Sequence, residues 1–183
     1  MTGQCVEVPL VVIGVDLADD ATAARLGGSL DDMLWSKAGG AVIATVFASS
    51  DPVHAAVSAA RRICRVEPTA AVVRVHPDLV TIPAIAARVG VSRQAVQQWV
   101  AGSGPRPFPV PFASLEPEAK SVKVWRWADV TPWLHGVKGL TFEALPTSGQ
   151  IAHIDAALGD LDGARGGVED VDVAARAAHQ SVR

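Results

Sequence analysis

The chain has 183 residues, 49% of them hydrophobic, and a formal net charge of −3. This is enough apolar sequence to bury one or two small cores, which excludes an overall disordered chain. No apolar run approaches the ~20 uncharged residues of a membrane-spanning helix, and no basic stretch with an apolar signal core opens the sequence. We therefore expect a cytoplasmic protein.

The two cysteines, Cys5 and Cys64, are isolated in the sequence. Neither belongs to a CxxC motif or to a Cys/His spacing suited to zinc, so we expect them to be reduced and to hold no metal. The sequence also contains no glycine-rich phosphate loop and no nucleophile with a nearby base. We therefore expect no cofactor and no enzyme activity.

Residues 1–76 alternate strand and helix signals. Asp51 and Pro52 open the clearest helix, because Asp is a good N-cap and Pro is favoured at the first helical position. The expected elements are a strand at 10–15, a helix from Asp19 to Leu26 ended by Gly27-Gly28, a strand at 33–36, a turn at 37–40, a strand at 41–48, a helix at 53–65 and a strand at 70–76.

This order, β-α-β-β-α-β, predicts an α+β fold in which a ferredoxin-like sandwich has both helices on one face of an antiparallel sheet. Without the strand at 33–36, a three-stranded βαβαβ layer would remain. The acid pairs Asp19-Asp20 and Asp31-Asp32 are interpreted as helix-start and turn residues. The expected role of this domain is dimerisation or sensing.

Residues 82–100 predict two short helices joined by a glycine turn. The first carries Ile85, Ala86 and Val89 on one face, and Gly90 then supplies a turn with positive φ. Ser92 is the expected N-cap of the second helix. Three side chains of that helix are expected to point inward: Val96, Trp99 and Val100.

The outward side of the second helix carries four polar residues, none of them acidic: Arg93, Gln94, Gln97 and Gln98. Arg can bond the edge of guanine, and Gln the edge of adenine, through paired hydrogen bonds. Ser92 and the first free N–H groups of the helix suit a phosphate. A purely structural helical hairpin is the alternative. Trp99 is expected to be a core anchor whose replacement by Ala costs ~3–5 kcal/mol.

The sequence beyond this pair strengthens the DNA-binding interpretation. Residues 106–109 read Arg-Pro-Phe-Pro, residues 122–127 form a second strand signal, and Trp133-Leu134 closes a short helix. Residues 79–135 resemble the winged helix-turn-helix of the MerR-like excisionase group, with a longer wing at 113–121. The resemblance implies double-stranded DNA as the partner, helix 93–100 in the major groove, and a wing that adds Arg106, Lys120 and Lys123.

Charge is unevenly distributed along the chain. Residues 1–76 have a net charge of −2, residues 77–136 have six Lys or Arg against four Asp or Glu, and residues 137–183 have a net charge of −3. A net charge of +2 gives one small module little non-specific affinity. We therefore expect a homodimer, to which the sheet face or edge formed by residues 41–48 contributes.

Pro77-Asp78 marks the expected boundary between residues 1–76 and the module at 77–136. Residues 137–183 are expected to form a helical, partly flexible acidic tail. Ser148 caps its first helix, which extends through Leu158, and glycines at 163–167 separate it from a second helix at 168–179.

Three functions fit these features. The first is a bacterial transcriptional regulator that reads specific DNA. The second is a recombination accessory factor of excisionase type. The third is a protein-interaction or antitoxin-like module whose helix-turn-helix no longer binds DNA, which the acidic tail and the modest basic charge leave open.

Overall fold

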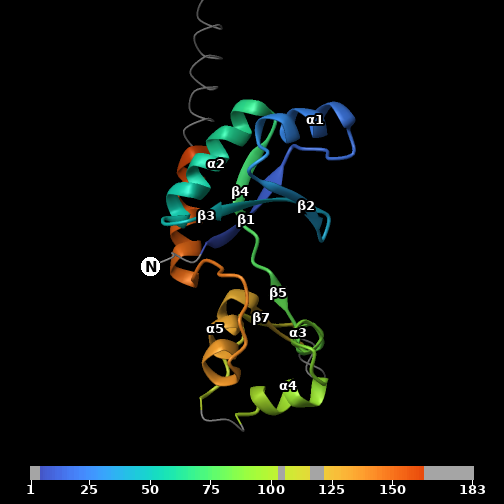
Figure 1. Ribbon diagram of the computed structural model, residues 1–183, viewed down its shortest axis with the longest axis vertical. Coiled ribbons are helices and arrows are strands. Elements are labelled where there is room, and N and C mark those ends of the chain that lie inside the picture. The colour runs from blue at the N-terminus through green and yellow to red at the C-terminus, as the bar shows by residue number, and fades with distance from the viewer. Residues whose placement is uncertain (1–4, 103–105, 116–121, 163–183) are drawn as a thin grey trace, which may run out of the picture. The chain divides into compact units, whose positions relative to one another are not determined.

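A computed structural model describes residues 5–102, 106–115 and 122–162 of the chain (Figure 1). The fold is α+β. The chain divides into two compact units: unit 1 contains residues 1–76 and 149–183, and unit 2 contains residues 77–148. None of the helices in the described ranges is long and apolar enough to cross a membrane.

Unit 1 contains a four-stranded sheet in the order β2-β3-β1-β4, in which every neighbouring pair is antiparallel. The strand expected at 33–36 therefore exists, and the three-stranded alternative is wrong. The elements are β1 (Val6–Ile13), α1 (Asp20–Ser29), β2 (Leu34–Ala38), β3 (Ala41–Ala48), α2 (Pro52–Val66) and β4 (Ala71–Val75), together with helical residues 149–162.

Local sequence accounts for most of these boundaries. The Asp19 carboxylate accepts a hydrogen bond from the Thr22 backbone N–H at 2.8 Å, and Asp51 accepts from the first backbone N–H groups of α2. Gly39 and Gly40 have φ angles of +55° and +82°, which the tight turn between β2 and β3 requires. The turn is shorter than the expected 37–40, because Lys37 and Ala38 still pair with β3.

The expectation that α1 ends at Gly27-Gly28 is wrong. The helix continues to Ser29, and the N–H of its C-cap residue Leu30 donates to the Leu26 carbonyl at 2.8 Å. Leu26 and Leu30 are both 1% exposed. Burial of two leucine side chains at ~1.5–3 kcal/mol each outweighs the ~1 kcal/mol that each glycine costs inside a helix.

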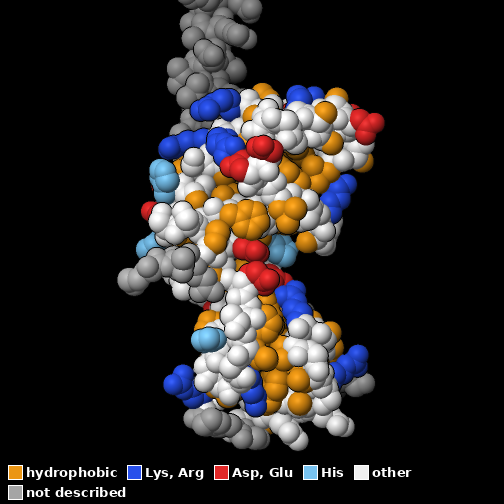
Figure 2. Space-filling model, viewed as in Figure 1, with side chains coloured by type: hydrophobic (Ala, Val, Ile, Leu, Met, Phe, Trp, Pro, Cys, Tyr) orange, Lys and Arg blue, Asp and Glu red, His pale blue; other side chains and the backbone are white. Residues whose placement is uncertain are grey.

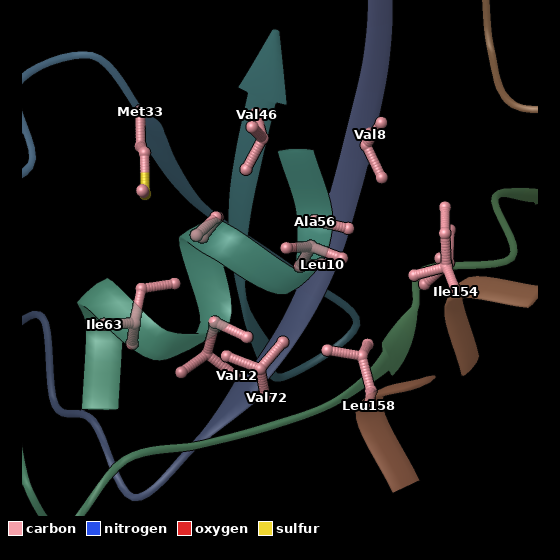
Figure 3. Packing of buried hydrophobic residues seen from close by; sticks show 14 of the residues in the cluster. Val8, Leu10, Val12, Met33, Val46, Ala56, Ile63, Val72, Ile154 and Leu158 are labelled. Atoms are coloured by element: carbon pink, nitrogen blue, oxygen red, sulfur yellow. The ribbon is translucent and has the colours of Figure 1, made fainter. Parts of the chain in front are cut away.

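The core of unit 1 lies between one face of the sheet and its helices. Successive residues of a strand point to opposite faces, and Val8, Leu10 and Val12 of β1 all point into this core. Figure 3 shows them with Ala56 and Ile63 of α2 and with Ile154 and Leu158 of the last helix. The same face of the sheet is thus covered by helices from distant parts of the sequence.

The last described helix belongs to unit 1. Ile151, Ile154 and Leu158 are 7%, 0% and 1% exposed in the unit 1 core. The Asp155 carboxylate accepts a hydrogen bond from the Val75 backbone N–H of β4 at 2.7 Å. The expected tail at 137–183 is therefore divided, because residues 137–148 belong to unit 2. The helix expected at 168–179 lies outside the described residues.

We predict that Ile154→Ala destabilises unit 1 by ~2–5 kcal/mol, the usual cost of truncating a fully buried aliphatic side chain. His153 is exposed on the same helix, so His153→Ala is the matched control. Denaturant unfolding followed by circular dichroism measures both variants. Equal stability of Ile154→Ala and the wild type would contradict the placement of this helix.

Ion pairs link the helices and loops of unit 1. The Arg62 guanidinium donates to both carboxylate oxygens of Asp32 at 2.6 and 2.7 Å. Arg25 donates to the buried Glu67, which also accepts from the Thr69 hydroxyl at 2.8 Å. The hydrogen bond from Arg25, followed by the one from Thr69, lowers the pKa of Glu67. Both hydrogen bonds therefore favour the ionised form of Glu67.

This lowered pKa predicts a pH-dependent contribution to stability. A carboxyl group whose folded-state pKa is depressed stabilises the fold above its unfolded pKa of about 4.3, and this contribution disappears as the pH falls through the folded pKa. Glu67→Gln should therefore lower the melting temperature at pH 7, and this difference should shrink as the pH falls below the unfolded pKa. A melting-temperature difference that stays constant across this range would contradict the prediction.

Unit 2 contains a three-stranded antiparallel sheet in the order β5-β7-β6. Its own core includes three tryptophans, Trp125, Trp127 and Trp133. The elements are β5 (Leu79–Val80), α3 (Ile82–Val89), α4 (Arg93–Val100), β6 (Ala113–Leu115), β7 (Val122–Arg126) and α5 (Trp127–Lys138).

Candidate nucleic-acid interface

The two helices α3 and α4 meet through a turn that the local sequence specifies. Gly90 is the C-cap of α3 with φ +72°, a left-handed conformation that favours glycine. The next backbone N–H, from Val91, donates to the Ala86 carbonyl at 3.0 Å. The Ser92 hydroxyl then accepts from the Ala95 backbone N–H at 3.2 Å and caps α4. The expected turn and cap are both confirmed.

The inner faces of the two helices are buried in the unit 2 core. Ile85 and Val96 are 0% exposed, and Ala86 is 4% exposed. Trp99 and Val100 are half-buried and pack against the same cluster. Burial of this side of α4 leaves the opposite side of the helix facing outward.

The outward side of α4 is polar and exposed. At 100° per residue, its four long polar side chains cover an arc of roughly 140° on the helix surface. None of the four forms a hydrogen bond or ion pair within the described part of the chain. The expected residues are therefore together on one surface: Ser92, Arg93, Gln94, Gln97 and Gln98.

No acidic residue occurs in the sequence between Leu79 and Leu115. On the side of unit 2 seen in Figure 2, Lys and Arg side chains lie near α4, and no Asp or Glu is seen beside it. The outward face of α4 can therefore approach a polyanion without like-charge repulsion from its own neighbours. Arg93 supplies the positive charge of this face.

Two other arginines of unit 2 are engaged inside the module. Arg88 donates to both carboxylate oxygens of Asp78 at 2.8 Å, and its guanidinium lies 5.0 Å from the Trp127 ring centroid. The hydrogen bond to Asp78 raises the pKa of Arg88. The Arg126 guanidinium lies 4.3 Å from the Phe112 ring centroid. These contacts stabilise the module and do not point to a role in base recognition.

A chain of aromatic side chains connects α4 to the segment that follows it. The Trp99 ring centroid lies 5.6 Å from that of Trp133, and Phe108 lies 4.9 Å from Trp133 and 5.7 Å from Trp125. The Trp125 and Trp133 indole N–H groups donate to the backbone carbonyls of Pro109 at 2.9 Å and Arg106 at 3.3 Å. The indoles thus position residues 106–109 against the core.

Sequence reasoning did not predict these indole hydrogen bonds. The only signal was that tryptophan recurs in residues 125–133 after an Arg-Pro-Phe-Pro segment. A buried indole N–H needs a hydrogen-bond acceptor. Prolines disfavour helix and sheet pairing in a segment, so its backbone carbonyls stay available as acceptors. The pairing of each indole with its carbonyl depends on the tertiary arrangement.

The three wing residues expected at the interface differ in their placement. Arg106 is exposed, and a Cβ built at Gly136 of α5 would lie 3.2 Å from its Nη1 atom, so its guanidinium lies beside α5. Lys123 is exposed on β7, opposite Ser114 of β6. Lys120 lies outside the described residues.

Trp99 is less deeply buried than expected for a core anchor. It is half-buried at the edge of the aromatic cluster, with the Lys138 ammonium 5.0 Å from its ring centroid, whereas Trp125 is 0% exposed. Because Trp125 loses more contacts on truncation, it is the stronger anchor of unit 2.

We predict that Trp125→Ala destabilises unit 2 by ~3–5 kcal/mol and that Trp99→Ala costs less. Differential scanning calorimetry of the full chain compares the two variants. Each thermal transition is assigned to a unit by the variant that shifts it. A larger loss for Trp99→Ala would contradict this ranking.

Within the described ranges, no three His, Cys, Asp or Glu side chains group in a way that could hold a metal ion. Cys64 donates its thiol hydrogen to the Ala70 carbonyl at 3.4 Å. Comparisons with protein families, curated proteins and solved structures found no match to this chain.

Proposed function

We propose that this protein is a sequence-specific DNA-binding regulator and that α4 of unit 2 reads the major groove. The observation that carries the proposal is the outward face of α4, where one arginine and three glutamines are exposed together and without acidic neighbours. Arg and Gln are the side chains suited to paired hydrogen bonds with guanine and adenine.

The dimensions of α4 fit this role. Eight residues at 1.5 Å each give a helix about 12 Å long, which matches three to four base pairs along the groove. The polar arc faces outward along its whole length, while Ser92 sits at the positive end of the helix, where a phosphate is favoured. Arg93 and Gln97 are one turn apart, as are Gln94 and Gln98, so two adjacent rows reach adjacent bases.

We infer that residues 79–135 form a winged helix-turn-helix with β6 and β7 as the wing. The antiparallel pairing of β6 with β7 and the position of this hairpin between α4 and α5 support this inference. Lys123 then contacts a phosphate from the wing. Arg106, which lies beside α5, approaches the backbone from the segment that the indoles hold in place.

We also infer that unit 1 is a ferredoxin-like sandwich. Its element order β-α-β-β-α-β and its sheet order β2-β3-β1-β4 support that assignment. It provides dimerisation or sensing, and the protein acts in the bacterial cytoplasm without a catalytic step. The domain organisation that we propose inserts the DNA-binding module between β4 and the last helix of the sandwich.

The proposal predicts that the full-length protein enriches specific fragments from sheared genomic DNA. Gln94→Ala combined with Gln97→Ala should relax base preference at one or two positions by ~1–3 kcal/mol each, because both paired contacts are lost. Lys123→Ala should weaken binding to all sequences equally and reduce the salt slope of log K by about 1. Fragment sequencing and titrations at several salt concentrations provide these readouts.

Arg65 of α2 is an exposed arginine in unit 1, so Arg65→Ala is the charge-matched control for Arg93→Ala. Loss of affinity in both variants would indicate general electrostatics in place of base reading. If no fragment is enriched over background, the regulator is rejected in favour of a protein-interaction module. Enrichment confined to recombination sites would identify the excisionase-like alternative.

A further inference from the structure

Within the described ranges, no helix packs on one face of the unit 1 sheet. We call it the open face and define it by Val11, Ile13, Leu34, Ile43, Phe47 and Val73. Val11 and Ile43 pair at its centre and are 4% and 3% exposed, whereas the other four large side chains remain 38–59% exposed. Figure 2 shows hydrophobic side chains at the surface of unit 1 around β2 and β3. Large apolar patches of this kind mark binding surfaces.

The edges of the sheet are less suitable for association than its face. β3 is an interior strand between β2 and β1, so residues 41–48 have no free edge, and that expected alternative is wrong. At the β4 edge, the Val75 backbone N–H is already bonded to Asp155. β2 has only five residues. A strand of another chain could add only to the short edge at β2, whereas the face of the sheet offers a broader surface.

The size of the open face fits a dimer interface. β1 and β3 have eight residues each, and β2 and β4 have five each. At about 3.3 Å per residue and about 4.8 Å between strands, these give a flat area of roughly 400 Å², before side-chain relief and rim are added. Stable interfaces bury about 800 Å² on each partner. The flat face supplies about half of this area, so side-chain relief and the rim must supply the rest. Two antiparallel sheets pack at about 10 Å separation.

The charges of the open face are complementary to one another. Glu7 lies beside Phe47 at one end of the face, and Arg74 lies beside Val11 on the edge strand β4. Neither forms an ion pair with another residue in the described ranges. In a two-fold symmetric dimer, if a residue of one copy contacts a second residue of the other copy, the same contact forms again with the two copies exchanged. A contact between Glu7 of one copy and Arg74 of the other would therefore form two ion pairs in one dimer.

We propose that the open face binds the open face of a second copy of this chain, with Glu7 of each copy pairing with Arg74 of the other. The four exposed apolar side chains around the buried centre provide the stability, and the charges select the orientation. This dimer presents two copies of unit 2 on one assembly. It rests on unit 1 alone and does not depend on DNA binding by α4.

Sedimentation equilibrium of the full-length chain tests the proposal. The wild type should have the mass of two chains, and Phe47→Glu and Leu34→Glu should each raise the dimer dissociation constant at least tenfold. Val110 is 86% exposed in unit 2, so Val110→Glu is the matched control and should leave the mass unchanged. Circular dichroism melting confirms that each variant is folded.

A charge exchange tests the orientation. Glu7→Arg and Arg74→Glu should each weaken the dimer, and the double variant should recover most of the loss. The proposal is overturned if the folded wild type is monomeric at tens of micromolar, because the face then stays free or is covered by the same chain. A folded Phe47→Glu variant that remains a tight dimer, or a double variant weaker than both single variants, also overturns it.

Discussion

The burial of Ile85 and Val96 in one core determines the orientation of α4. Both side chains are 0% exposed, and the left-handed Gly90 turn lets α3 and α4 approach closely enough to share that core. Rotation of α4 about its axis would expose Val96 and bury polar glutamine side chains without partners, each at a cost of ~1–3 kcal/mol. The outward face of α4 is therefore a consequence of packing on its inner side.

The aromatic cluster extends this constraint to the rest of unit 2. Phe108 contacts both Trp125 and Trp133, and the two indoles hold the Arg106 and Pro109 carbonyls. The segment after α4 is thus tied to β7 and α5 by side chains that also form the core. The same arrangement uses Arg88 and Arg126 internally, whereas Arg93, Arg106 and Lys123 are exposed cations.

Unit 1 shows how one apolar sheet can serve two purposes. Its helix-covered face gains Ile154 and Leu158 from a helix that follows unit 2 in the sequence. Both ends of unit 2 are therefore connected to unit 1, and the module is not on a single free tether. The opposite face keeps large hydrophobic side chains at the surface, which is costly unless another surface covers them.

The sequence by itself determined the elements whose signals are local. The sequence correctly predicted Asp51-Pro52 at the start of α2, Gly90 and Ser92 between α3 and α4, and the strand at Ala41–Ala48. Caps, turns and short strand signals depend on residues close in the chain. The exposed polar face of α4 followed from helical periodicity.

Only the tertiary structure decided the features that depend on distant residues. The passage of α1 through Gly27-Gly28 reflects burial of Leu26 and Leu30, which overrides local helix propensity. The return of Ile154 to the unit 1 core and the interior position of β3 required knowledge of which surfaces meet. The partial exposure of Trp99 has the same origin, because helical periodicity gives the direction of a side chain and not the depth of the core that receives it.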